Sequence, residues 1–128
     1  MPGLGKDMAA FGPRQDLQLG RNLEEFINIA LRDFTHLTVL MYMVREARAG
    51  CSAGDIARIT NDPKPEIQAV LDRFRLLNMV REAGGLFARK YMYEREGPRA
   101  HLVSALLKLW EHKSTHDEIL RRVLAPKK

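Results

Sequence analysis

The amino-acid sequence predicts a mainly helical protein with one small β-hairpin. Apolar residues recur at helical spacing in several segments on both sides of residues 79–93, as in amphipathic helices. Residues 79–93, MVREAGGLFARKYMY, are rich in strand formers around a glycine pair, which favours a hairpin with a two-residue turn. A length of 128 residues fits one domain around a single core.

The N-terminal part is expected to hold an arm and two helices. Residues 1–20 carry four glycines and two prolines without sustained periodicity, which predicts a loose arm. Thr35 is a candidate N-cap for the second helix, and Gly50 marks its expected end. The apolar positions that form the buried faces of these helices are 23, 26, 27, 30, 31 and 34 in the first, and Leu37, Leu40, Met41 and Val44 in the second.

Ser52 and Asp55 have the spacing of a capping box, because each side chain can accept a hydrogen bond from the backbone N–H of the other residue. They predict a short helix that runs through Ile56 and Ile59.

A second amphipathic helix is expected to begin at two prolines, Pro63 and Pro65. Proline is tolerated in the first turn, where backbone N–H groups lack intrahelical partners and φ is already helical. Asp62 or Lys64 is the expected cap. The predicted buried stripe consists of Ile67, Val70, Leu71, Phe74 and Leu77.

Helical spacing resumes after Gly97-Pro98. Thr115 and Glu118 have the spacing of a cap for a last helix, and they equally fit the interior of one long helix. We therefore divide the chain into an arm over 1–20, a domain over 21–97 and a C-terminal helical segment over 98–128.

The stretch GDIARITNDPKPEIQAVLDRFRLLNMVREAGGLFARKYMY, residues 54–93, orders a short helix, a turn, a second helix and a hairpin. It resembles the winged helix–turn–helix domains of bacterial transcription regulators, broadly the MarR and ArsR groups. Met79-Val80 is similar to the family's entry into the first wing strand. The resemblance implies a winged helix–turn–helix with flanking N- and C-terminal helices, acting as a cytoplasmic regulator that binds double-stranded DNA.

The resemblance implies that the helix over about 63–77 lies in the major groove and that the hairpin over about 79–93 contacts the DNA backbone. Gln can pair with adenine and Lys with guanine, and Glu can accept from cytosine. Arginines suit the phosphates. The DNA-binding residues implied in this way are Asn61, Lys64, Glu66, Gln68, Arg73, Arg75, Arg81, Arg89 and Lys90.

Two features depart from this pattern. The expected hairpin tip, Ala83-Gly84-Gly85-Leu86, carries no arginine, and residues 45–95 hold ten basic and seven acidic residues, a net charge of only +3. Glu66 suits the helix dipole but repels phosphate. Because winged helices also bind proteins, the alternative function is a protein–protein interaction module that does not bind DNA.

In the regulators that the chain resembles, flanking helices join two subunits. The apolar stripe near the C-terminus is wider than one small core covers, so we expect a homodimer, with packing on the chain's own domain as the alternative. Leu23, Phe26, Ile27 and Leu31 suit either role. The expected dimer interface consists of Leu102, Val103, Leu106, Leu107 and Trp110.

Composition indicates which kind of partner and which cellular compartment the protein fits. A formal charge of +5 leans mildly toward a polyanionic partner. No apolar run reaches about 18 residues, so no membrane span is expected, and residues 1–15 lack the apolar stretch of a signal peptide. The single cysteine, Cys51, excludes an internal disulfide and fits a reducing cytoplasm.

No enzyme, cofactor or metal site is expected. The sequence contains no GxSxG, P-loop or dinucleotide-type glycine motif. His101 and His112 match part of a metal-sensing site found on the last helix of some ArsR-like repressors. Arg99 and Thr115 stand where that pattern needs further ligands, and His116 is one position too late.

Overall fold

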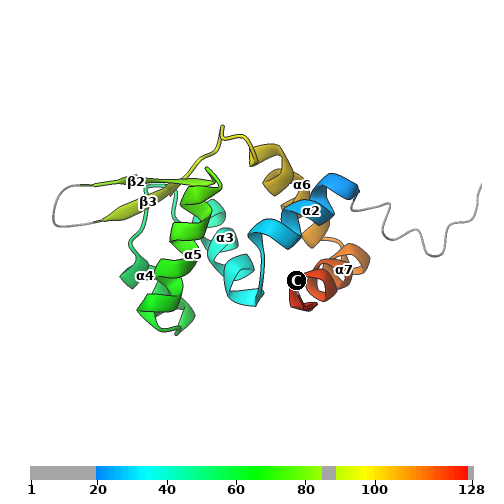
Figure 1. Cartoon of the computed structure of the whole chain (residues 1–128), viewed down its shortest axis with the longest axis horizontal. Helices are drawn as coiled ribbons and strands as arrows, with labels where there is room; N and C mark the ends of the chain where they lie inside the picture. Colours follow the sequence, from blue (N-terminus) through cyan, green and yellow to red (C-terminus); the bar gives the residue numbers. More distant parts are fainter. Residues whose placement is uncertain (1–19, 85–88, 127–128) are drawn as a thin grey trace, which may run out of the picture.

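The computed structural model describes residues 20–84 and 89–126, which form a helical protein with a two-stranded antiparallel sheet (Figure 1). The mainly helical class with a hairpin is confirmed, whereas residues 1–19 of the expected arm lie outside the described residues. Nowhere in the described ranges is a helix long and apolar enough to cross a membrane. The elements are α2 (Arg21–Ala30), α3 (Phe34–Arg45), α4 (Ala53–Thr60), α5 (Lys64–Leu76), β2 (Val80–Ala83), β3 (Lys90–Tyr93), α6 (Ala100–Trp110) and α7 (Lys113–Leu124).

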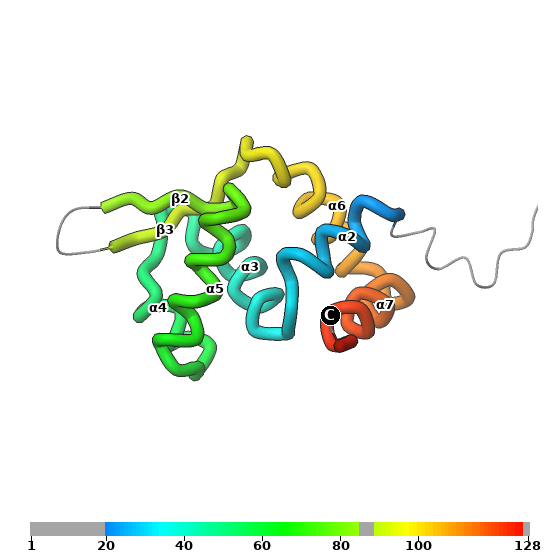
Figure 2. Tube along the Cα trace, in the orientation of Figure 1, coloured from blue at the N-terminus to red at the C-terminus, as the bar shows by residue number. Residues whose placement is uncertain are grey.

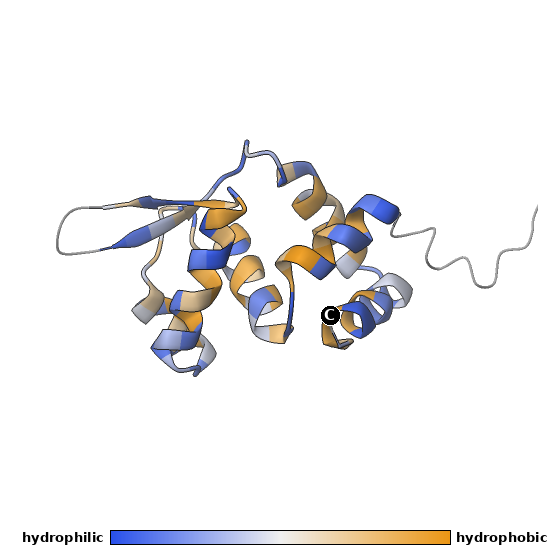
Figure 3. Ribbon diagram, viewed as in Figure 1, coloured by the Kyte–Doolittle hydropathy of each residue, from blue (hydrophilic) through white to orange (hydrophobic). Residues whose placement is uncertain are grey.

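The elements gather into two halves that share α3 (Figure 2). The hairpin half contains α4, α5 and the hairpin, and the helical half contains α2, α6 and α7. Helix α3 packs against α4, α5 and β3 on one side and against α7 on the other. Hydrophobic residues are concentrated on α3 and α6, whereas the start of β3 is hydrophilic (Figure 3). One continuous core therefore joins both halves.

The start of α3 differs from the prediction. Asp33 is the N-cap, and its carboxylate accepts from the backbone N–H of His36 at 3.0 Å and lies 2.7 Å from His36 Nδ1. Burial alone would raise the pKa of Asp33, but these bonds to His36 hold it below its usual value. Thr35 is therefore the second residue of the helix, and Phe34, expected to be buried, is 51% exposed.

Helix α3 ends at Arg45, earlier than the expected end near Gly50. Gly50 instead has a φ of 99°, which L-residues rarely adopt. The turn leads Cys51 into a backbone bridge with Tyr91, in which the two N–H···O bonds measure 3.0 and 2.7 Å. The chain before α4 is thereby attached to the hairpin.

The capping box of α4 is confirmed. Ser52 Oγ accepts from the Asp55 N–H at 3.1 Å, and Asp55 Oδ2 accepts from the Ser52 N–H at 3.2 Å. Ile56 is buried, but Ile59 is 56% exposed. The helix ends at Asn61, which has a left-handed φ of 60°.

The prolines initiate α5, as predicted. Pro63 occupies the cap position in extended conformation, and its carbonyl accepts from the N–H groups of Glu66 and Ile67. Neither Asp62 nor Lys64 is the cap, because Lys64 is already the first helical residue. The buried stripe of Ile67, Val70, Leu71 and Phe74 is confirmed, while Leu77 is only half-buried.

Helix α5 ends in a Schellman motif. Asn78 adopts a φ of 60°, its N–H donates to the Arg75 carbonyl at 3.0 Å, and the Met79 N–H donates to the Phe74 carbonyl at 2.9 Å. Met79 is buried. This tight stop directs the chain into β2.

The hairpin has a longer connection than the two-residue Gly84-Gly85 turn that the sequence predicts. Ala83 pairs with Lys90 and Val80 with Tyr93, so residues 84–89 connect the strands, and residues 85–88 of this connection lie outside the described residues. This register sets Glu82 opposite Tyr91.

The C-terminal segment forms two helices rather than one long helix. His112 occupies the cap position of α7, and Thr115 lies inside the helix, where its hydroxyl donates to the carbonyls of Leu109 and His112. Val103 and Leu106, two residues of the expected dimer interface, are buried in the chain's own core at 1% and 0% exposure. These two side chains have no surface left for a partner.

Candidate nucleic-acid interface

One side of α5, which we call its outer ridge, faces away from the buried stripe. With about 3.6 residues per turn, this ridge consists of Pro65, Ala69, Asp72 and Leu76. All four are exposed, and Leu76 is exposed by 83%. The outer ridge therefore offers a carboxylate and apolar surface, but no cation.

The first turn of α5 and the preceding turn hold three of the predicted DNA-binding residues. Lys64 and Asn61 are exposed, and Lys64 lies beside Gly54 of α4. Glu66 is also exposed but lies on another flank of the helix, where it lines a hollow of about 390 Å³ together with Asp33 and His36. Lys64 and Glu66 consequently point to different neighbours.

Gln68 faces the hairpin. Its Nε2 donates to the hydroxyl of Tyr91 at 2.8 Å and to Asp72 Oδ1 at 2.9 Å, and Tyr91 is fully buried. A bidentate contact with adenine needs both the amide nitrogen and the amide oxygen. The nitrogen of Gln68 is already engaged within the chain.

Arg73 is also engaged within the chain. Its Nε donates to the Ile29 carbonyl at 2.9 Å, and Nη2 donates to the same oxygen. Arg95 donates to the Val44 carbonyl at 3.1 Å, and Arg99 donates to the Leu77 carbonyl. These carbonyls stand at the C-terminal ends of α2, α3 and α5, where the last carbonyls lack intrahelical partners. The three arginines therefore supply hydrogen bonds to carbonyls that the helices leave unpaired.

The remaining predicted arginines form exposed ion pairs around the hairpin. Arg75 Nη1 lies 3.5 Å from Glu82 Oε1, and Arg89 Nε lies 2.7 Å from Glu82 Oε2. Arg81 pairs with Glu94 at 3.3 Å. The hydrogen bond from Arg89 holds the pKa of Glu82 below its usual value, and the same bond raises the pKa of Arg89.

The exposed charged residues of α5 and the hairpin make up what we call the α5–hairpin surface, which extends over both faces of the hairpin because neighbouring strand residues such as Arg81 and Glu82 point to opposite sides. Its cations are exposed, and Lys64 and Lys90 form no ion pair within the described ranges. Exposed ion pairs contribute little to stability, so the paired arginines can exchange partners. The surface consists of Lys64, Arg75, Arg81, Arg89 and Lys90 with the carboxylates Glu82 and Glu94.

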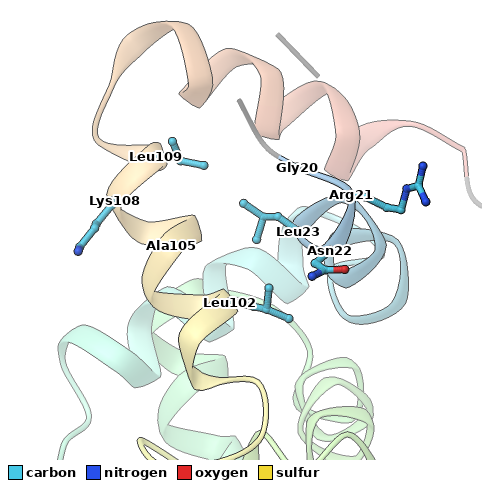
Figure 4. Close-up of a pocket in the computed structure, with 8 residues that line it drawn as sticks. All are labelled: Gly20, Arg21, Asn22, Leu23, Leu102, Ala105, Lys108 and Leu109. Carbon is cyan, nitrogen blue, oxygen red and sulfur yellow. The ribbon is translucent and has the colours of Figure 1, made fainter. Parts of the chain in front are cut away.

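An apolar groove of about 460 Å³ lies between α2 and α6 (Figure 4). Leu23 of α2 and Leu102 and Leu109 of α6 point into it, whereas the charged ends of Arg21 and Lys108 extend away from it. Leu102, a residue of the expected dimer interface, therefore remains partly exposed in this groove.

Trp110, another expected interface residue, contacts α7 instead of standing free. Its ring centroid lies 3.7 Å from that of His116, whose Nδ1 lies 3.1 Å from the Trp110 carbonyl. Leu107 is half-buried. The residues of the expected dimer interface are thus in three environments. Val103 and Leu106 lie in the core, Trp110 packs against α7, and Leu102 and Leu107 are partly exposed.

Two observations concern metal binding and the reactivity of the single cysteine. In the part of the chain that is described, no three His, Cys, Asp or Glu side chains are placed to hold a metal ion. Cys51 is buried, and burial, with a smaller contribution from Asp55, raises its pKa to about 11. Its thiol is consequently protonated at neutral pH and a poor nucleophile.

Comparisons with protein-family models, curated proteins and solved structures found no match to this chain. Sequence reasoning missed Glu82 and Tyr91, which connect the hairpin to α5. Their roles follow from the strand register and from contacts between distant residues, which no local motif signals.

Proposed function

We propose that this protein is a winged helix–turn–helix transcription regulator of the cytoplasm that binds double-stranded DNA. The observation that carries the proposal is the α5–hairpin surface, which presents five exposed cations and two carboxylates from adjacent elements. The order of α4, a turn ending in Pro63, α5 and the hairpin supports it. In such proteins the second helix meets the major groove.

The proposed contacts are mostly with phosphates. The outer ridge of α5 carries Asp72 and no cation, and Gln68 already donates to Tyr91. Lys64 and Asn61, both exposed, remain to meet base edges. We therefore expect modest sequence discrimination, about 1–3 kcal/mol for a good base contact from Lys64. Most of the affinity should come from phosphate contacts and should weaken as the salt concentration rises.

A salt series tests the proposal. Binding of the full chain to a labelled random duplex is measured by fluorescence anisotropy at several salt concentrations. The logarithm of the association constant should fall linearly with the logarithm of salt concentration, by about 0.9 for each phosphate contacted. No detectable binding at low salt would rule out DNA as the partner.

Paired variants locate the surface. Lys64→Gln combined with Lys90→Gln should weaken binding and reduce the salt slope by about 0.9, the share of the phosphate contact assigned to Lys90. The matched control is Lys108→Gln combined with Lys113→Gln, which removes two exposed lysines from the helical half. If the control weakens binding as much as the test pair, the α5–hairpin surface is not the DNA-binding face.

The second candidate function is a protein-interaction module that does not bind DNA. The exposed Leu76 and the acidic residue Asp72 on the outer ridge favour it, because apolar surface with a polar border marks protein interfaces. If Leu76→Lys strengthens binding to the random duplex, the added cation lies near phosphate and the DNA proposal gains support. A wild-type protein that ignores DNA at low salt would favour the module.

The homodimer also remains a proposal, on a reduced surface. With Val103 and Leu106 in the core, it rests on Leu102, Leu107 and the neighbouring Leu109, which are half-buried. Light scattering at micromolar concentration should give about twice the chain mass of 14.6 kDa, and Leu102→Ser with Leu109→Ser should reduce it. A wild-type monomer at high concentration would refute the dimer.

A further inference from the structure

Two arginines from different elements converge on one carboxylate of β2. Arg75 comes from the last turn of α5, and Arg89 immediately precedes β3. They approach different oxygens of Glu82, with Arg75 Nη1 3.5 Å from Oε1 and Arg89 Nε 2.7 Å from Oε2. Each oxygen of the carboxylate therefore faces a different guanidinium group.

The surroundings hold this pair of cations in position. The Arg89 guanidinium lies 5.7 Å from the ring centroid of Tyr91, and the Tyr91 hydroxyl accepts from Gln68 of α5 at 2.8 Å. Tyr91 is fully buried. The hairpin and α5 are thus joined by Tyr91, the ring beside which the Arg89 guanidinium lies.

The carboxylate between them is open to exchange. The side chain of Glu82 is 33% exposed, and those of Arg75 and Arg89 are 56% and 52% exposed. Water and ions compete for contacts at such exposure, so an external anion can replace the glutamate. Arginine binds carboxylate and phosphate with the same paired N–H···O geometry.

We infer that Arg75 and Arg89 form a binding site for one backbone phosphate of duplex DNA, in which Glu82 occupies the position of the phosphate while the protein is unbound. The inference rests on the proposed function. It assigns to Glu82 a role opposite to that of its neighbours, because the glutamate competes with the ligand. The affinity for DNA is then set partly by an acidic residue.

Replacing the competitor tests the site. Glu82→Gln keeps the shape of the side chain and removes its charge, so it should tighten binding to a random duplex by about 3- to 10-fold at low salt. The salt slope should change little, because the wild type contacts the same phosphate once Glu82 is displaced. The matched control is Glu96→Gln, the same change at an exposed residue that forms no ion pair within the described ranges. The control should change affinity by less than about twofold.

A variant without the two arginines distinguishes competition between Glu82 and the phosphate from a general effect of removing a negative charge. In a protein that already carries Arg75→Gln and Arg89→Gln, the further change Glu82→Gln should give no more than the control does. Thermal melts of each variant verify folding, and melting temperatures should stay close to that of the wild type, because these side chains are exposed.

The outcomes are distinguishable. If wild type binds DNA but Glu82→Gln matches Glu96→Gln, the phosphate site is refuted and DNA binding stands. If Glu82→Gln tightens binding equally without the two arginines, the effect is long-range electrostatics and the site is also refuted. If neither wild type nor Glu82→Gln binds at low salt, both the site and the proposed function fail.

Discussion

Glu82 and Glu118 lie in opposite halves of the molecule, and each carboxylate is held by two arginines. Glu82 meets Arg75 and Arg89 at the hairpin, whereas Glu118 of α7 accepts from Arg121 and Arg122. The side chain of Glu118 is only 9% exposed, against 33% for Glu82. The carboxylate of Glu118 is therefore shielded from water, although its partner Arg121 is 67% exposed, whereas water reaches the carboxylate of Glu82.

Burial decides what each cluster can do. Arg122 also reaches Glu24 at 3.2 Å and so ties α7 to α2, and a partner removed from such a site leaves a charge without water to solvate it. At the hairpin, water can replace any lost partner. One cluster is expected to hold two helices together, and the other to exchange its carboxylate for a ligand.

The largest expected effect tests whether the two halves are one folding unit. Phe74 is fully buried in α5 and its ring lies 5.9 Å from that of His36 in α3, so Phe74→Ala should lower the free energy of unfolding by about 3–5 kcal/mol. The matched change Leu76→Ala, at a residue 83% exposed, should cost less than about 0.5 kcal/mol.

Urea unfolding of Phe74→Ala should be followed by far-ultraviolet circular dichroism and by the emission of Trp110, which lies in the other half. Because α3 packs against both halves, the two curves should coincide. An earlier transition by one probe would show that the halves unfold separately.

The next effect compares the two glutamates directly. Glu118→Gln should lower the free energy of unfolding at pH 7 by about 1–2 kcal/mol, because charge-assisted hydrogen bonds between α7 side chains are weakened in a buried place. Glu82→Gln should leave the unfolding curve unchanged within error. Equal losses for the two variants would contradict the role given to burial.

The pH dependence of the Glu118 effect follows from its lowered pKa. The hydrogen bonds from Arg121 and then from Arg122 outweigh burial and hold this pKa below the ordinary value, which is about 4.3 for glutamate. The stability that Glu118 contributes is thus fully present above that ordinary value and is lost as the pH falls through the folded-state pKa. The difference between wild type and Glu118→Gln, measured by urea unfolding from pH 7 to about pH 3, should shrink on acidification. A difference that grows on acidification would contradict the assignment.

The smallest effect separates two arginines of α5. Arg73→Gln removes hydrogen bonds to the Ile29 carbonyl and should cost about 1 kcal/mol of stability without changing the salt slope of DNA binding. Arg75→Gln should leave stability unchanged and weaken duplex binding, because Arg89 alone then holds the phosphate. Both are measured by urea unfolding and duplex titration, and identical behaviour of the two variants would refute the division.

The sequence predicts much of the hairpin half because its signals are local. The capping box of Ser52 and Asp55, the prolines of α5 and the stripe from Ile67 to Phe74 are all read within one or two turns. The predicted cap of α3 was wrong because Asp33 and Thr35 stand two residues apart and both can cap a helix. Local rules do not decide between such neighbours.

The features that could not be predicted depend on contacts between distant residues. The hairpin register follows Tyr91, which bridges Cys51 and bonds Gln68. The apolar spacing of α6 does not reveal that α2 and α7 cover Val103 and Leu106. A count of charges in the sequence treats every cation as available to bind a ligand. In the structure, three arginines instead donate to carbonyls at helix ends, and in one of these bonds donor and acceptor are 44 positions apart in the sequence.

The left-handed stop at Asn78 has a consequence for how this gene can vary. Only glycine, asparagine and aspartate adopt a φ of 60° at low cost, and the bonds of Asn78 and Met79 to Arg75 and Phe74 depend on that turn. In a library of every amino acid at position 78, selected for soluble expression, glycine and aspartate should survive with asparagine. Proline, which cannot adopt this φ and lacks the N–H, should be the most depleted, followed by valine, isoleucine and threonine, although the side chain at position 78 is exposed to solvent.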